Sequence, residues 1–118
     1  APWIFALQRA AWRWGAHAVP LPGIGAFFQA HQHRLTLIIF AISDLLETGV
    51  TLPDLKAYLD TPSGLEFATK ATAVTLKPGE VAWVPYGFGV VPVFLPTNEK
   101  IQDESFAVGW HFPLFVKE

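Results

Sequence analysis

The sequence predicts one domain of mainly β structure with short helices, an α+β fold. Three observations support this prediction. Of the 118 residues, 52% are hydrophobic, enough to bury a core without disulfides or metals. Short runs rich in Val, Ile, Phe and Thr recur from residue 26 onward, separated by turn residues. Two patterns of the capping-box form, at 51–54 and 63–66, mark short helices between those runs.

The first element is expected to be an amphipathic helix, within an N-terminal arm of residues 1–15. Pro2 suits a first helical turn and Gly15 suits a stop. Apolar side chains occupy most of its surface at helical spacing, so the helix needs cover. Three alternatives are open: burial in its own domain, docking on a partner protein, or insertion in a membrane interface. The residues expected to contact the partner or the membrane are Trp3, Leu7, Trp12 and Trp14.

Prolines and glycines at 19–25 form a linker, after which extended structure is expected. The runs 26–30 and 35–42 predict strands on either side of His31-Gln32-His33-Arg34, and the second run, apolar on both faces, is expected deep in the core. A helical insertion follows at 52–70. From Thr72 the pattern is β again, with strands predicted near 72–77, 80–84, 89–95 and 105–112.

Composition excludes several functional classes. Only 15% of the residues are charged, the net charge is −2, and the eight Lys and Arg residues are scattered, so no nucleic acid is expected as a partner. Cysteine is absent, and no G-x-S-x-G motif accompanies the serines. The longest apolar run is far shorter than the ~20 residues of a membrane-spanning helix. Methionine is absent as well, so we expect a processed or partial chain; no feature indicates a compartment.

One stretch resembles a known family. "LKPGEVAWVPYG", residues 76–87, is similar to the second conserved motif of cupins, small jelly-roll β-barrels that often hold a metal; Gly79, Pro85 and Gly87 stand at the motif spacing. Gly25, followed by His31-x-His33, is similar to the start of the first motif. The resemblance implies a cupin-like antiparallel β-barrel over residues 1–118, with 52–70 as a two-helix insertion.

The same resemblance implies that the metal site is degenerate. Val90 stands where the second motif has a ligating histidine, and Phe94 replaces an asparagine of that motif. Leu37 and Ile38 stand where the first motif has a ligating glutamate. At most His31 and His33 remain as metal ligands, and on a strand they would share one face. We therefore expect no cofactor and no catalytic residue, the alternative being one divalent transition metal.

Aromatic residues near the second motif suggest a ligand pocket at the barrel mouth, since small barrels commonly bind ligands there. The alternative is that these side chains simply fill the barrel. The candidate pocket residues are Trp83, Tyr86, Phe88 and Phe94.

The function expected from these observations is that of a non-catalytic structural or interaction subunit of a larger protein assembly, with association to a membrane as an option. The low charge content, the Trp-rich arm and the apolar tail "FPLFV" favour surfaces covered by other chains or by lipid. Two alternatives come from other classes. One is a metal-dependent cupin enzyme, a small oxygenase or isomerase, that uses His31 and His33; the other is a metal-free barrel that binds a small ligand.

Overall fold

The computed structural model describes residues 15–19, 22–93 and 106–111, and for 106–111 it describes the backbone alone. The predicted N-terminal helix and the apolar tail lie outside these residues, as do the side chains of Trp3, Leu7, Trp12, Trp14 and Phe94.

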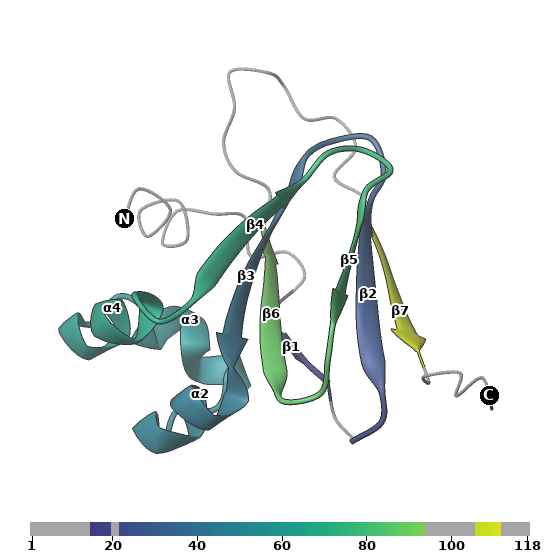
Figure 1. The fold of residues 1–118 in the computed structure, drawn as a ribbon. Helices are drawn as coiled ribbons and strands as arrows, with labels where there is room; N and C mark the ends of the chain where they lie inside the picture. The colour runs from purple at the N-terminus through teal and green to yellow at the C-terminus, as the bar shows by residue number, and fades with distance from the viewer. Residues whose placement is uncertain (1–14, 20–21, 94–105, 112–118) are drawn as a thin grey trace.

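Seven strands form two antiparallel sheets (Figure 1). The four-stranded sheet has the order β1-β6-β3-β4, with β1 at His17–Ala18, β6 at Phe88–Val93, β3 at Leu35–Ala41 and β4 at Thr72–Leu76. The three-stranded sheet has the order β5-β2-β7, with β5 at Val81–Val84, β2 at Gly25–Ala30 and β7 at Phe106–His111. Helices follow β3: α2 at Ile42–Thr48, the 3-10 helix η1 at Leu52–Asp54, α3 at Leu55–Tyr58 and α4 at Pro62–Ala68.

The mixed α+β class with dominant strands is therefore confirmed, and the predicted closed barrel is wrong. The two sheets do not close on each other within the described residues. The physical reason is the connection between β3 and β4. Its residues form helices, which satisfy their backbone hydrogen bonds internally, so this segment supplies no strand to link the two sheets.

A double corner joins the two sheets. The chain passes from β2 into β3 and returns from β4 into β5, and the two passages pair on both sides of the corner, Gln29 with Val81 and Leu35 with Leu76. At the corner the Gly79 N–H donates to the Ala30 carbonyl (2.8 Å) and the Ala30 N–H donates to the Glu80 carbonyl (3.3 Å). Both sheets are thereby fixed in one register.

The returning corner is a tight turn over Lys77-Pro78-Gly79-Glu80. The Glu80 N–H donates to the Lys77 carbonyl (2.9 Å), and the Glu80 carboxylate accepts from the Lys77 N–H (2.7 Å). Gly79 has φ +86°, which the third position of a type II turn requires and which an L side chain rarely adopts. This turn separates the two strands that the sequence predicts near 72–77 and 80–84.

Two hydrophobic clusters give the molecule three layers. Between the sheets lies the inter-sheet core, which includes Phe28, Leu35, Leu37, Val84 and Val90. On the other face of the four-stranded sheet the helices pack over the helix-side core, where Phe40 meets Phe67 edge to face with ring centroids 5.7 Å apart. Strand β3 is buried from both sides, as predicted.

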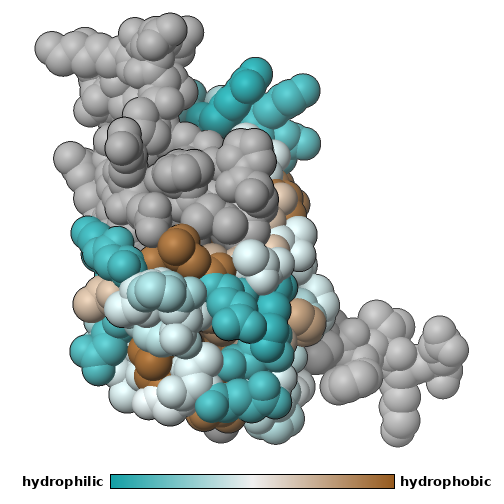
Figure 2. All heavy atoms as spheres, turned by 90° about the vertical axis from the view of Figure 1, so that its left-hand side faces the viewer, coloured by the Kyte–Doolittle hydropathy of each residue, from teal (hydrophilic) through white to brown (hydrophobic). Residues whose placement is uncertain are grey.

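The helical layer differs in detail from the prediction. Helix α2 was not anticipated, because Ala41 at its N-cap offers no side-chain hydrogen bond and the helix continues an apolar run. Helix α4 begins earlier than the pattern at 63–66 implied: Thr61 is its N-cap, and its hydroxyl accepts from the Gly64 N–H (3.0 Å). Seen from the helical side, this layer shows polar residues spread between small apolar patches (Figure 2).

We predict that Gly64→Ala destabilises the fold by about 2 kcal/mol, because a Cβ at this buried position would meet the Tyr58 carbonyl and the backbone of Leu59. Thermal or urea unfolding measures the change. The matched control is Ser63→Ala, an exposed neighbour in the same helix, whose effect should stay within about 0.5 kcal/mol. Equal effects of the two substitutions would contradict the close packing of α4 on α3.

Candidate functional site

The outward-facing side of the three-stranded sheet is the main candidate site. Side chains alternate along its strands: Phe28 and Val84 enter the inter-sheet core, and their neighbours point the other way. We call the surface formed by Phe27, Gln29, Val81 and Trp83 the outer sheet face. Val81 and Trp83 are 53% and 54% exposed, and Phe27 is half-buried.

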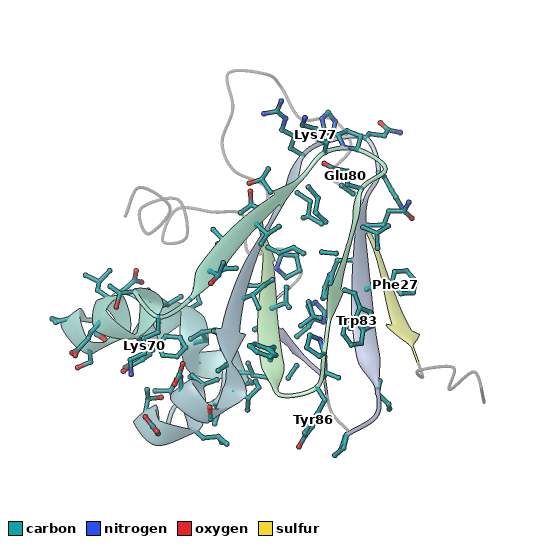
Figure 3. All side chains as sticks on the ribbon, viewed as in Figure 1. Phe27, Lys70, Lys77, Glu80, Trp83 and Tyr86 are labelled. Atoms are coloured by element: carbon teal, nitrogen blue, oxygen red, sulfur yellow. The ribbon has the colours of Figure 1, made fainter. Side chains whose placement is uncertain are left out.

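Trp83 and Phe27 are cross-strand neighbours on the outer sheet face. They are directly opposite each other in the ladder between β5 and β2, and Figure 3 shows them side by side. The Trp83 indole also lies over Gly25, close enough that a Cβ at residue 25 would collide with it. Because Gly25 has no side chain, the indole can pack with one side of its ring against the sheet.

The three strands of this sheet contain no Asp, Glu, Lys or Arg. The register continues the outer sheet face onto β7, where Gly109 is opposite Phe27 and Ala107 is opposite Gln29. Residues of small or no side chain thus lie opposite Phe27 and Gln29. The result is an uncharged surface with an aromatic ridge, suited to apolar contacts.

The predicted metal ligands lie at the double corner. His31 is exposed and His33 is half-buried, both in the connection between β2 and β3. Among the residues the structure describes, no three His, Cys, Asp or Glu side chains are grouped closely enough to hold an ion. His111 is the last residue of β7, opposite Gly25.

The positions at which the cupin resemblance implies further ligands are occupied by core side chains. Leu37 and Val90 are 0% and 1% exposed, and both belong to the inter-sheet core. Ile38, the alternative position for the glutamate, belongs to the helix-side core. Apolar packing therefore fills the places where carboxylate or imidazole groups would be needed.

The described candidate pocket residues lie in three different elements of the chain. Trp83 lies on the outer sheet face, Tyr86 lies in the turn after β5, and Phe88 begins β6; Tyr86 and Phe88 are 49% and 39% exposed. Gly87, with φ +95°, allows the turn between them. Their role in binding a small ligand stays a prediction.

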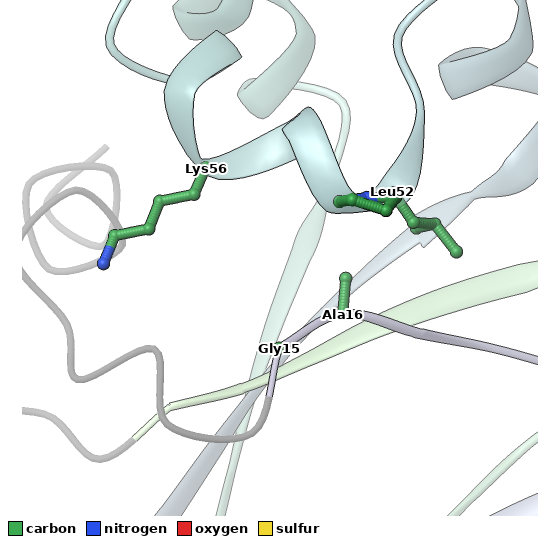
Figure 4. Close-up of a pocket in the computed structure, with 5 residues that line it drawn as sticks. Gly15, Ala16, Leu52 and Lys56 are labelled. Carbon is green, nitrogen blue, oxygen red and sulfur yellow. The ribbon is translucent and has the colours of Figure 1, made fainter.

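An open cavity of about 370 Å³ lies elsewhere, between the start of β1 and the helical layer (Figure 4). The described residues that line it are Gly15, Ala16, Leu52, Pro53 and Lys56. These residues place one amine, that of Lys56, beside apolar walls.

His17 is a further residue of interest that sequence analysis did not identify. It lies in β1 opposite Val90, with its ring edge to face with Phe28 at 6.2 Å between centroids. Its Nε2 atom is buried, and the described part of the chain offers it no hydrogen-bond partner. A lone histidine in a loop-like stretch carries no sequence signal for such a position.

The chain matches no protein-family model, no curated protein and no solved structure. The relationship to cupins therefore stays a prediction, carried by residues 76–87 and 25–33 alone.

Sequence analysis identified Trp83 as a candidate site residue. It did not identify Phe27 and Val81 as parts of the same surface. A period-two pattern predicts both strands, yet which strands are neighbours depends on the double corner. The signal that was available is the absence of charge from all three strands, together with an aromatic residue at an outward position of two of them.

We predict that the purified chain binds no stoichiometric transition metal, because His31 and His33 supply two ligands and a catalytic zinc site uses three protein ligands. Elemental analysis after incubation with zinc, iron or nickel and removal of free ion measures the content. The control is the His31→Ala, His33→Ala double variant, which should give the same result. One ion per chain in the parent and none in the double variant would refute the prediction.

Proposed function

We propose that this domain is a non-catalytic interaction subunit that docks on another protein chain through the outer sheet face. The single observation that carries the proposal is the exposure of Trp83 and Val81 on a sheet whose strands contain no Asp, Glu, Lys or Arg. The cores of protein interfaces are enriched in aromatic residues and depleted of charge, and this surface has that composition.

The layering supports a docking role for this side of the molecule. The four-stranded sheet has the helices on one face and the three-stranded sheet on the other. The three-stranded sheet packs one face in the inter-sheet core, and its other face carries the exposed apolar side chains. Soluble proteins seldom leave an apolar patch larger than a few hundred Å² without a use for it.

The chemistry of the surface favours protein over the other partners considered. Membranes with anionic lipids and nucleic acids both select for Lys and Arg, which the three strands lack. Among the described residues no helix has the length and hydropathy needed to cross a bilayer. A protein surface with apolar side chains of its own fits this face best.

Support for the non-catalytic part comes from the inter-sheet core. Leu37 and Val90 contribute to packing there, at the positions where the cupin resemblance implies ligands. We also propose a relationship to cupins that have lost their metal site. It is supported by the pairing of the two motif-like stretches, because residues that share one metal must lie close together. The strands within the two stretches, β2 and β5, are antiparallel partners. The proposal assigns no cofactor to the domain.

Photo-crosslinking in cells of the source organism tests the proposal. A benzoylphenylalanine in place of Trp83 should give one discrete crosslinked species, because that side chain would lie inside the interface. The matched control carries the same group in place of Glu66, which is exposed on α4 in the helical layer. That control should give no discrete product.

Adding Val81→Glu to the position-83 probe should abolish the product, since a carboxylate desolvated against apolar groups is unfavourable. The proposal fails when position 83 gives no discrete product, when position 66 gives the same one, or when Val81→Glu leaves the product unchanged.

A further inference from the structure

We infer that β5 pairs edge to edge with β5 of a second copy of this chain, antiparallel about a two-fold axis at Ala82. The inference rests on the proposed function above, because β5 carries Val81 and Trp83 of the outer sheet face; the partner that it names is another copy of the same domain, joined at the edge of that face. It is supported by the backbone N–H and C=O groups at the outer edge of β5, which can form hydrogen bonds with the same groups of a second copy.

Strand β5 is an edge strand of the three-stranded sheet. It pairs with β2 on one side, and within the described residues no strand lies on its other side. Toward the other residues that the structure describes, Val81–Val84 make no hydrogen bonds beyond that ladder. An unpaired strand edge presents a row of N–H and C=O groups that bind best to another strand.

The hydrogen-bond pattern tells which groups point outward. The Ala30 N–H donates to the Glu80 carbonyl, so this pair is a bonded one. Bonded and non-bonded pairs alternate along an antiparallel ladder. Ala82 and Val84 therefore direct their backbone groups to β2, and Val81 and Trp83 direct theirs to the free edge.

These outward groups are self-complementary. With the two-fold axis at Ala82, Val81 of each copy lies opposite Trp83 of the other. Two bonded pairs result, and the N–H and C=O groups of both residues in both copies are satisfied. No other groups of β5 are required.

The side chains agree with this register. Val81 and Trp83 are both on the outer sheet face, so the pairing places valine beside tryptophan, an aromatic and β-branched pair that is favourable across strands. The two three-stranded sheets become one sheet of six strands, and the two outer sheet faces become one continuous surface.

Strand β5 also lacks the usual protections against such pairing. Natural edge strands are guarded by charged residues, prolines or bulges, and β5 reads Val-Ala-Trp-Val. Two of the other described edge strands are less suited than β5. Strand β1 has two residues, and β4 carries the polar side chains of Thr72 and Thr75.

The interface expected from this pairing is small. The contact involves the four residues of β5 in each copy, with Val81 and Trp83 as the main side chains. Such a contact buries less than the ~800 Å² per partner that is typical of stable complexes. The dimer should therefore dissociate on dilution, and its mass should rise with concentration in sedimentation equilibrium.

A single-cysteine variant tests the register directly, because the chain has no cysteine of its own. In the proposed dimer Ala82 meets its own copy in a non-bonded pair, where Cα atoms lie about 4.5 Å apart, within the range of a disulfide. Ala82→Cys should form a covalent dimer under mild oxidation. The matched control is Ala73→Cys, an equally half-buried alanine on the edge strand β4, which should remain monomeric.

A second variant separates pairing from folding. Val81→Pro removes an outward N–H and leaves the bonded pairs with β2 intact, so it should retain the circular dichroism of the parent and weaken self-association at least tenfold. The inference is overturned when Ala82→Cys crosslinks no faster than Ala73→Cys, when the parent stays one chain at every concentration, or when Val81→Pro remains as dimeric as the parent.

Failure of this inference is distinguishable from failure of the proposed function. A position-83 crosslink to a different protein, with no Ala82→Cys dimer, removes the second copy as partner and leaves the docking role. A position-83 product of twice the chain mass, together with the Ala82→Cys dimer, supports both. Absence of both products removes both.

Discussion

The structure depends on one constraint, the double corner at which two chain passages cross together from one sheet to the other. Because Gly79 and Ala30 are hydrogen-bonded there, the ladders of β2 with β5 and of β3 with β4 share a register that neither sheet sets alone. A shift of one residue would exchange core and surface side chains along both strands. The inter-sheet core, the exposure of Trp83 and the free edge of β5 all follow from this register. The type II turn at Gly79 therefore influences the strand register of both sheets.

The three layers are asymmetric in their chemistry. The helical layer carries charged side chains such as Glu66 and Lys70, and it covers the four-stranded sheet through the helix-side core. The three-stranded sheet has no formally charged Asp, Glu, Lys or Arg on either face of its strands. A sheet face without charge gains free energy when water leaves it, at roughly 25 cal/mol per Å² of apolar surface. This asymmetry is why we assign the docking role to the outer sheet face and the supporting role to the helices.

The proposed cupin relationship is consistent with the proposed interaction role, because both involve the loss of a metal site. A metal pocket between sheets needs polar ligands in the interior, and their burial is costly without the ion. In this chain Leu37 and Val90 pack in that interior, which removes the cost and stabilises the contact between the sheets. On this proposal, the former pocket is part of the inter-sheet core. The scaffold then serves to present β5 and its neighbours rather than to hold an ion.

The sequence by itself determined most of the local structure. Period-two runs and turn residues located strands β2 to β7 closely, and the prolines and hydroxyl residues at 51–66 marked the helical segment, although the cap proved to be Thr61. Strand β1 and helix α2 were not predicted, because β1 is only two residues long and α2 has no capping side chain at its N-terminus. Only the tertiary structure decided that the sheets stay open, that Phe27 lies beside Trp83 and that Val81 is exposed. The physical reason is that propensity acts between near neighbours along the chain, whereas closure, strand order and exposure depend on pairs some fifty residues apart that the double corner brings together.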